Sequence, residues 1–305
     1  MRKRLENIDW FAVMHPDDRR KVEWLNGLQV PYVSKIDFIR EIASHPLDHE
    51  LKTWYEIFKS DLKYYTFKDF LNATTGRYQE AYNEVENQGE GINITDESLP
   101  EMHKQLVEAC RILGIQDVPA YSTDWFYGPF HYSNGEKHRR IIIESGCADL
   151  FSEGEMMFTL GHELGHFAAG HKPYHMLIMS FYLPFMNDPS FKAWATIVKL
   201  PLLEWYRKSD YTADRIGLLC CQDINVALST MVKKAGLPKS CYDQISISGF
   251  IQQAREFEEC YVETIDDVVK KLTIRSAEFP WLVDRAAKLL EWYESGEYQR
   301  VLNGN

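Results

Sequence analysis

The chain has 305 residues, of which 45% are hydrophobic and 13% aromatic, so it can bury a large core in one big domain or two smaller ones. Its 34 basic and 45 acidic residues give a formal net charge of −11, which argues against a nucleic-acid backbone as partner. The composition therefore indicates a globular protein with a solvated, acidic surface.

The cysteines and the apolar segments indicate the cellular compartment in which the protein is located. None of the six cysteines has C-x-x-C spacing, and Cys220 and Cys221 are adjacent, so we expect reduced core thiols. No apolar segment follows the basic residues at positions 2–4, and the longest apolar run, residues 176–186, is about half of the ~20 residues that a membrane span needs. We therefore expect a soluble, cytoplasmic protein without a transmembrane segment.

The first 86 or so residues are aromatic-rich and helix-like. The helical spacing is clearest at Leu51, Trp54, Tyr55, Phe58 and Leu62. A polar, glycine-containing linker at residues 87–93 follows. We predict an N-terminal helical accessory lobe over residues 1–95.

The next elements predict a helix and a small sheet. Ser98 and Glu101 have capping-box spacing, with Pro100 in the first turn of a helix that ends at Gly114. Residues 118–122 and 140–145 have the composition of strands, and residues 133–136 have that of a turn between them.

A second capping box, formed by Ser152 and Glu155, predicts a helix from residue 153 to about residue 169. This helix carries the H-E-x-x-H segment His162-Glu163-Leu164-Gly165-His166. Two imidazoles four residues apart lie on one helix face and can bind one Zn²⁺, and a carboxylate between them can take a proton from water that the metal acidifies to a pKa of about 7. We therefore predict His162 and His166 as zinc ligands and Glu163 as the general base.

A third ligand has to come from another element, because the helix carries none one turn further on. Asp210 and Asp214 share a face of a predicted helix that runs to about residue 221, and two acids at this spacing repel unless one binds a cation and the other accepts an imidazole N–H. We assign Asp210 to the metal and Asp214 to a ligand histidine. Glu204 is a rival that points to another side of the helix, and His171 is an alternative ligand that we expect instead at the helix end, where an imidazolium meets the helix dipole.

Prolines, glycines and a capping aspartate in the rest of the chain predict where further helices begin and end. Pro189 starts one, and Pro201 breaks or kinks it before the segment with the two aspartates. Asp223 caps another helix up to Gly236, and a last one spans residues 281–293. We expect the apolar run at 176–186 to be a buried helix on the active-site domain rather than a lid.

The motifs GHELGH (161–166) and DYTADRIGL (210–218) together resemble the M48 metallopeptidases, a family of gluzincins whose second motif is Glu-x-x-Ala-Asp. Residues 106–114, 202–207 and 286–298 resemble soluble bacterial members, so the resemblance covers roughly residues 100–298. It implies an α+β, predominantly helical fold, in which a zincin-like metallopeptidase core with a small sheet (96–236) lies between the N-terminal lobe (1–95) and a C-terminal helical extension (237–305) packed on the core.

Three positions depart from the family pattern. The family's third ligand is usually glutamate, whereas Asp210 is one methylene shorter, so its helix must approach the metal more closely or bind it differently. Gly128-Pro129 stands where the family often has Asn-Ala on a strand that pairs with substrate, and proline lacks the N–H for that ladder. Phe279 replaces the histidine of the family's Thr-His-Pro segment, although Arg285 occupies the arginine position that follows.

These patterns predict a zinc-dependent endopeptidase that acts on a peptide or protein substrate, with Asp214 orienting one histidine. The candidate transition-state or substrate contacts are His131, His138 and Arg285. The alternative is a non-catalytic, zinc-containing adaptor that binds a peptide or protein, which Gly128-Pro129 and Phe279 favour. The intact Glu163 argues against the adaptor, because holding zinc requires only the ligands. An exopeptidase or a dedicated processing protease is a third interpretation.

Overall fold

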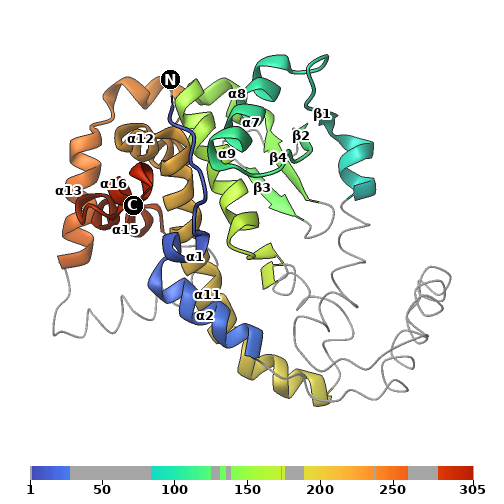
Figure 1. Ribbon diagram of the computed structural model, residues 1–305, viewed down its shortest axis with the longest axis vertical. Coiled ribbons are helices and arrows are strands. Elements are labelled where there is room, and N and C mark those ends of the chain that lie inside the picture. Colours follow the sequence, from blue (N-terminus) through green and yellow to red (C-terminus); the bar gives the residue numbers. More distant parts are fainter. Residues whose placement is uncertain are drawn as a thin grey trace.

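The computed structural model describes residues 2–27, 84–124, 131–134, 139–172, 174–175, 189–235, 238–259 and 281–304. This part of the chain is predominantly helical and contains one small sheet, which confirms the α+β fold class expected from the sequence. Helices α9 (Glu153–Ala168) and α11 (Pro189–Cys221) lie between the sheet and the C-terminal helices (Figure 1). Several predicted features lie outside the described residues: the 51–62 helix, the 176–186 run, Gly128-Pro129, His138 and Phe279.

The sheet contains four short strands in the order β1-β2-β4-β3. Strands β2 (Ala120–Thr123) and β4 (Arg140–Glu144) are parallel and agree with the two predicted strands, and every residue of β4 is buried. The other two pair antiparallel at the edges: β1 (Ile92–Asn93) lies in the predicted linker, and β3 (His131–Asn134) includes residues predicted as a turn. Strand β1 has only two residues, too few for an alternating pattern, and β3 ends in Ser133-Asn134, which have the composition of a turn.

Helix α7 (Pro100–Leu113) precedes β2 and ends as predicted, at Gly114 with a φ of 63°. Its predicted capping box is wrong. The N-cap residue is Leu99, with a φ of 61° and no side-chain capping bond. Ser98 instead belongs to a preceding turn, in which its N–H donates to the Thr95 hydroxyl at 3.0 Å and its carbonyl accepts from the Thr95 N–H at 2.7 Å.

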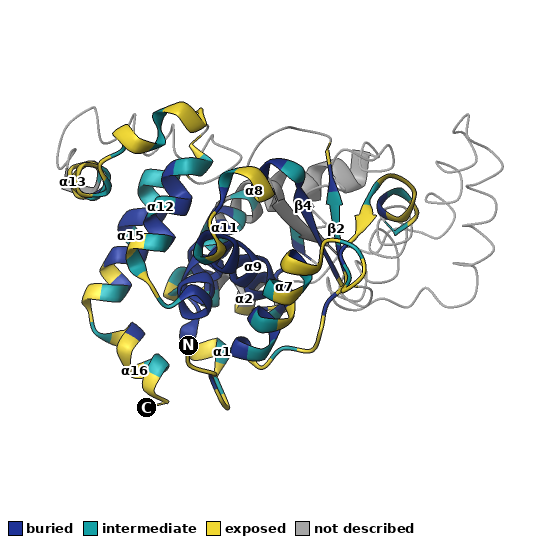
Figure 2. Ribbon diagram, turned by 90° about the horizontal axis from the view of Figure 1, so that it is seen from above, coloured by how far each residue is buried: buried dark blue, intermediate teal, exposed yellow. Residues whose placement is uncertain are grey.

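Helix α9 begins at the predicted capping box. The Ser152 N–H donates to the Glu155 carboxylate at 2.7 Å, and the Glu155 N–H donates to the Ser152 hydroxyl at 3.4 Å. The helix is buried along most of its length (Figure 2), which explains why its sequence is apolar on more than one face.

Helix α11 runs without interruption through Pro201, so the predicted break does not occur. A proline inside a helix removes one backbone hydrogen bond and costs about 3 kcal/mol. In a 33-residue helix whose second half is packed on α9, the neighbouring turns remain held and the helix continues. Of the helices described, none has both the length and the apolar character needed to cross a bilayer.

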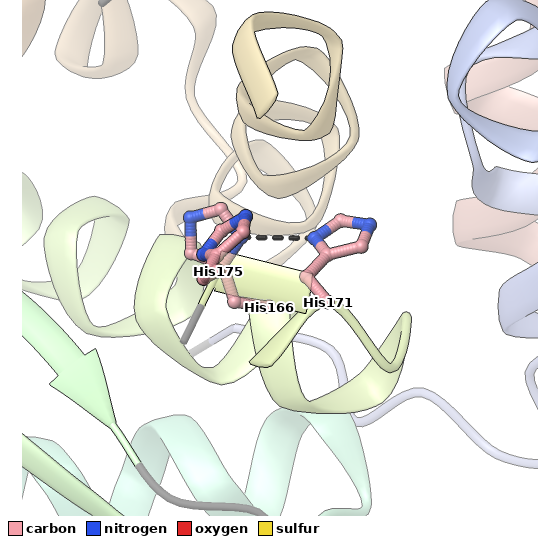
Figure 3. Close-up of side chains that lie close together, drawn as sticks. All are labelled: His166, His171 and His175. Carbon is pink, nitrogen blue, oxygen red and sulfur yellow. Dashed lines mark hydrogen bonds between the residues drawn. The ribbon is translucent and has the colours of Figure 1, made fainter. Parts of the chain in front are cut away.

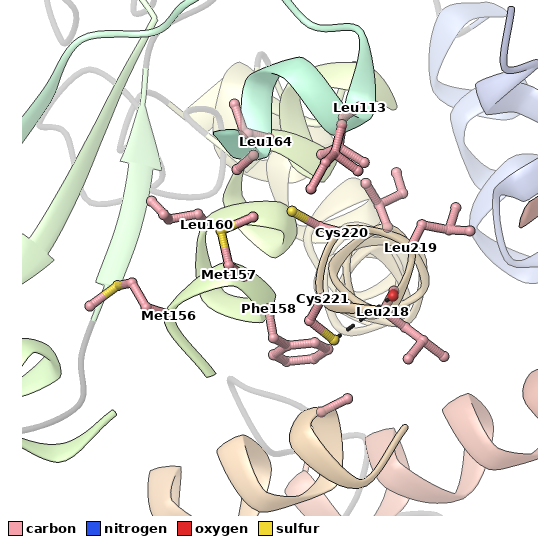
Figure 4. Close-up of a cluster of buried hydrophobic side chains, with 14 of the residues drawn as sticks. Leu113, Met156, Met157, Phe158, Leu160, Leu164, Leu218, Leu219, Cys220 and Cys221 are labelled. Carbon is pink, nitrogen blue, oxygen red and sulfur yellow. Dashed lines mark hydrogen bonds between the residues drawn. The ribbon is translucent and has the colours of Figure 1, made fainter. Parts of the chain in front are cut away.

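Helices α9 and α11 approach each other closely at glycines. A methyl group added to Gly161 would lie 2.4 Å from the Cys220 Cβ, and one added to Gly165 would lie 3.0 Å from the Ile216 Cβ. One added to Gly217 would lie 2.9 Å from the Phe158 carbonyl oxygen. Figure 4 shows the side chains that fill the rest of this contact, among them Leu160 of α9 and Leu113 of α7 around Cys220.

The N-terminal residues lie against α7 and α11. The Leu5 N–H donates to the Ile112 carbonyl at 2.8 Å, and the His15 N–H donates to the Thr212 hydroxyl at 2.9 Å. Arg215 donates to the carbonyls of Val13 and Met14 at 3.1 and 3.3 Å. Helices α1 (Trp10–Val13) and α2 (Pro16–Gly27) are thereby held along α11 (Figure 1).

The C-terminal part is helical, as predicted. Helix α12 (Ile224–Lys234) is capped by Asp223, as expected, and is followed by η2 (Lys239–Gln244) and α13 (Ile247–Glu259). Helix α15 (Leu282–Glu294) ends before Gly296, and α16 (Glu297–Asn303) follows. The buried core includes residues from all three predicted parts of the chain, and the division at residues 95 and 236 stays a prediction.

We expect Gly161→Ala to lower the free energy of unfolding by about 1–3 kcal/mol, because the new methyl group overpacks the contact with Cys220. Gly89→Ala is the matched control, since Gly89 is an exposed helical residue whose added methyl would meet nothing within 4 Å. Urea titration of both variants measures the difference. Equal stability of the two variants would contradict the close packing.

Burial, with Arg215 nearby, lowers the pKa of His15 to about 4 from 6.5. Between these pH values the unfolded chain binds a proton that the folded chain does not, so this histidine makes stability fall as the pH drops from about 6.5 to 4. We expect His15→Gln to make the unfolding free energy depend less steeply on pH in this window. The change in slope should correspond to the loss of up to about one proton taken up on unfolding. Denaturant titrations at several pH values test this, and an unchanged slope would contradict it.

Candidate metal centre

Three side chains predicted as metal ligands converge between α9 and α11. The Nε2 atoms of His162 and His166 are 3.2 Å apart. The Asp210 Oδ1 atom lies 3.4 Å from the His166 Nε2 atom and 3.9 Å from the His162 Nε2 atom. Both imidazoles are almost fully buried, and the Asp210 side chain is 13% exposed.

Asp214 lies behind His162, one helical turn beyond Asp210. Its Oδ1 atom is 2.9 Å from the His162 Nδ1 atom, and it is fully buried. Burial acts to raise the pKa of Asp214, but the Arg285 guanidinium and the hydrogen bond from His162 outweigh burial and hold the pKa below its usual value. The ionised carboxylate therefore accepts the Nδ1 proton of His162, which leaves the Nε2 lone pair of that ring facing His166 and Asp210.

Arg285 of α15 holds both aspartates in place. Its Nε and Nη2 atoms donate to the two Asp214 oxygens at 2.8 and 2.6 Å, and its Nη1 atom is 3.5 Å from Asp210 Oδ2. This cation explains how two acids can occupy neighbouring positions on one helix face. Its guanidinium is engaged with these carboxylates, and its predicted contact with a substrate stays a prediction.

The imidazole of His171 contacts the Nδ1 side of His166. The Nδ1 atoms of His166 and His171 are 2.9 Å apart, and His175 lies beside both rings, with centroids 4.9 Å from His166 and 5.8 Å from His171 (Figure 3). His171 follows the end of α9, as expected, but its ring is fully buried and turns back onto His166. Sequence reasoning missed this contact, because a spacing of five residues places two side chains on different faces of a continuous helix.

The geometry of the three converging atoms fits a metal ion. Ligand bonds of about 2.0–2.2 Å in a tetrahedron place neighbouring ligand atoms about 3.3–3.6 Å apart, close to the distances found here. Burial, followed by the nearby Lys172, lowers the pKa of His166 well below its ordinary value, so this imidazole is neutral. Two imidazole lone pairs and a carboxylate oxygen all accept rather than donate, and a cation is the partner that such a group of atoms requires.

Glu163, between the two histidines in sequence, is 3% exposed. Its carboxylate is 3.8 Å from the Lys172 ammonium, which is also buried. Burial lowers the pKa of Lys172 to about 8, although Glu163 opposes the shift. His131 is the first residue of β3, and Glu204 lies on α11 before the aspartates.

A comparison with protein-family sequence models matches residues 100–292 to Peptidase family M48. The chain belongs to this family of metallopeptidases. It is 28% identical over 236 residues to the plastoglobule-localized metallopeptidase 48 of the chloroplast of Arabidopsis thaliana, an alignment that covers 77% of this chain and 69% of that protein. No solved structure matches the chain. Membership of M48 implies a metal cofactor, and the converging histidines and aspartate are candidates to hold it.

We expect Asp210→Ala to lose bound metal on dialysis, because it removes one of the three converging ligand atoms. Glu204→Ala is the control on the same helix. Metal analysis after dialysis should find about one ion per chain in the control and less than about half of that in Asp210→Ala. Equal retention would reject Asp210 as a ligand.

Proposed function

We propose that this protein is a zinc-dependent peptide-bond hydrolase in which His162, His166 and Asp210 bind the metal and Glu163 is the general base. The observation that carries the proposal is the convergence of two imidazole nitrogens and a carboxylate oxygen beside a buried glutamate. Membership of a metallopeptidase family supports the same reaction class.

In this proposal each residue has a distinct task. His162 and Asp214 act together, because the carboxylate holds the imidazole in the tautomer whose Nε2 lone pair faces the metal. When bound, zinc would supply a Lewis acid that polarises the scissile carbonyl and lowers the pKa of a coordinated water to about 7. Glu163 takes the proton of the attacking water and passes it to the leaving amine nitrogen.

The buried Lys172 ammonium bears on the protonation of Glu163. At 3.8 Å it favours the ionised carboxylate, which is the form that a general base needs. His131, His138 and Arg285 remain candidate contacts with the substrate or transition state.

Endopeptidase cleavage and a cytoplasmic location belong to the proposal. Cleavage of casein with and without a chelator, analysed by mass spectrometry, distinguishes the alternatives. Internal cuts that the chelator abolishes support an endopeptidase, and terminal trimming supports an exopeptidase. Binding of peptide without cleavage by the metal-loaded protein would support the adaptor.

We expect Glu163→Gln to retain metal and fold but to lower peptide hydrolysis by at least about 100-fold, since the ligands stay while the base is lost. Metal content and the thermal unfolding midpoint are the controls that exclude a folding defect. Unchanged turnover in this variant would overturn the mechanism.

A further inference from the structure

The two histidines proposed as ligands have different partners on their far sides. His162 contacts the Asp214 carboxylate directly, whereas His166 contacts a second imidazole, His171. That imidazole in turn contacts a carboxylate, because its Nε2 atom lies 2.9 Å from the Asp18 Oδ2 atom. Asp18 comes from α2, in a part of the chain that precedes the region matched to the M48 family.

Asp18 is built to accept hydrogen bonds. It is fully buried, and Trp205 Nε1 donates to its Oδ1 atom at 2.8 Å, while the Thr212 hydroxyl donates to its Oδ2 atom at 2.5 Å. Both of its oxygens thus accept from side chains of α11. The Asp18 Oδ2 atom is therefore an acceptor to which the His171 Nε2 atom, 2.9 Å away, can donate.

These contacts fix the direction of the whole series of hydrogen bonds. When the Nε2 atom of a singly protonated His171 ring donates to Asp18, its Nδ1 atom is an acceptor. The His166 Nδ1 atom, 2.9 Å away, must then be the donor, and the His166 Nε2 atom is left with the lone pair that points at His162 and Asp210. Asp18 and His171 thus select the tautomer of His166 that can bind a metal.

A second metal ion held by His166, His171 and His175 is the competing interpretation of the same cluster. It would require His166 to lose its Nδ1 proton and to bridge two ions as an imidazolate. The Nδ1–Nδ1 distance of 2.9 Å is that of a hydrogen bond, and the His175 Nε2 atom lies 2.9 Å from the Ser209 hydroxyl. Each of the three rings therefore makes a hydrogen bond without a second ion.

We propose that Asp18 and His171 are positioning residues that orient the metal ligand His166, so that the N-terminal segment (residues 2–27) completes the metal site. The inference rests on the proposed function, since it takes His166 as a ligand. Loss of a partner behind a ligand histidine typically costs about 10–100-fold in metal affinity.

The test measures the zinc dissociation constant of the full chain by competition with a chromophoric chelator, and the visible spectrum of the cobalt(II) form. We expect His171→Phe to weaken zinc binding by about 10–100-fold and Asp18→Asn by about 10-fold. The double variant should be no weaker than His171→Phe alone, because Asp18 acts through His171. Asp214→Asn, which alters the direct partner of His162, provides the loss of zinc affinity with which these losses are compared.

Two controls separate positioning from loss of packing. His175→Phe removes a neighbouring imidazole of the same size that has no part in the series, and Arg215→Met removes the bonds from Arg215 to residues 13 and 14 without touching the histidines. We expect both controls to bind zinc within about threefold of the unaltered chain, even where their unfolding midpoints fall as far as that of Asp18→Asn.

Each outcome decides one question. An unaltered chain that binds no metal would refute the proposed function itself. Metal binding that is unchanged in His171→Phe, or additive losses in the double variant, would overturn the positioning role alone. Two ions per chain, falling to one in both His171→Phe and His175→Phe, would replace it with the second metal site.

Discussion

The close contact between α9 and α11 is the constraint on which the metal centre depends. Glycines at 161, 165 and 217 let the two backbones approach closely: an added methyl group would clash at 161 and 217 and would be tightly packed at 165. This approach brings Asp210 within 3.4 Å of His166, although an aspartate is one methylene shorter than the glutamate usual in the family. The glycines within and beside the histidine motif therefore act on ligand geometry as well as on packing.

Buried charge around the imidazoles is balanced by partners from other elements. Asp214 is ionised beside Arg285 of α15, and Asp18 of α2 makes hydrogen bonds with two side chains of α11 and with His171 after α9. An isolated buried charge is costly, whereas one whose hydrogen bonds are all satisfied holds its neighbours in a defined geometry. Ligand atoms that are fixed before an ion arrives lose little conformational freedom on binding it.

Features governed by local spacing could be predicted from the sequence. The Ser152 capping box, the i, i+4 histidines and the paired aspartates on α11 depend on helix geometry alone, and they lie as expected. Features set by tertiary packing could not be predicted: a single acid at position 18 has no pattern that would connect it to His171. Ser98 shows the opposite error, because a neighbouring threonine engages its backbone in a turn and the apparent capping box never forms.

The groups behind the two imidazoles are far apart along the chain, since Asp18 lies well before α9 and Arg285 lies well after α11. A ribosome makes α15 after every other element of the centre, so until then Asp214 would be a buried anion without its guanidinium partner. A polypeptide that ends before α15 would therefore hold Asp210 and Asp214 side by side without the cation that balances their charge.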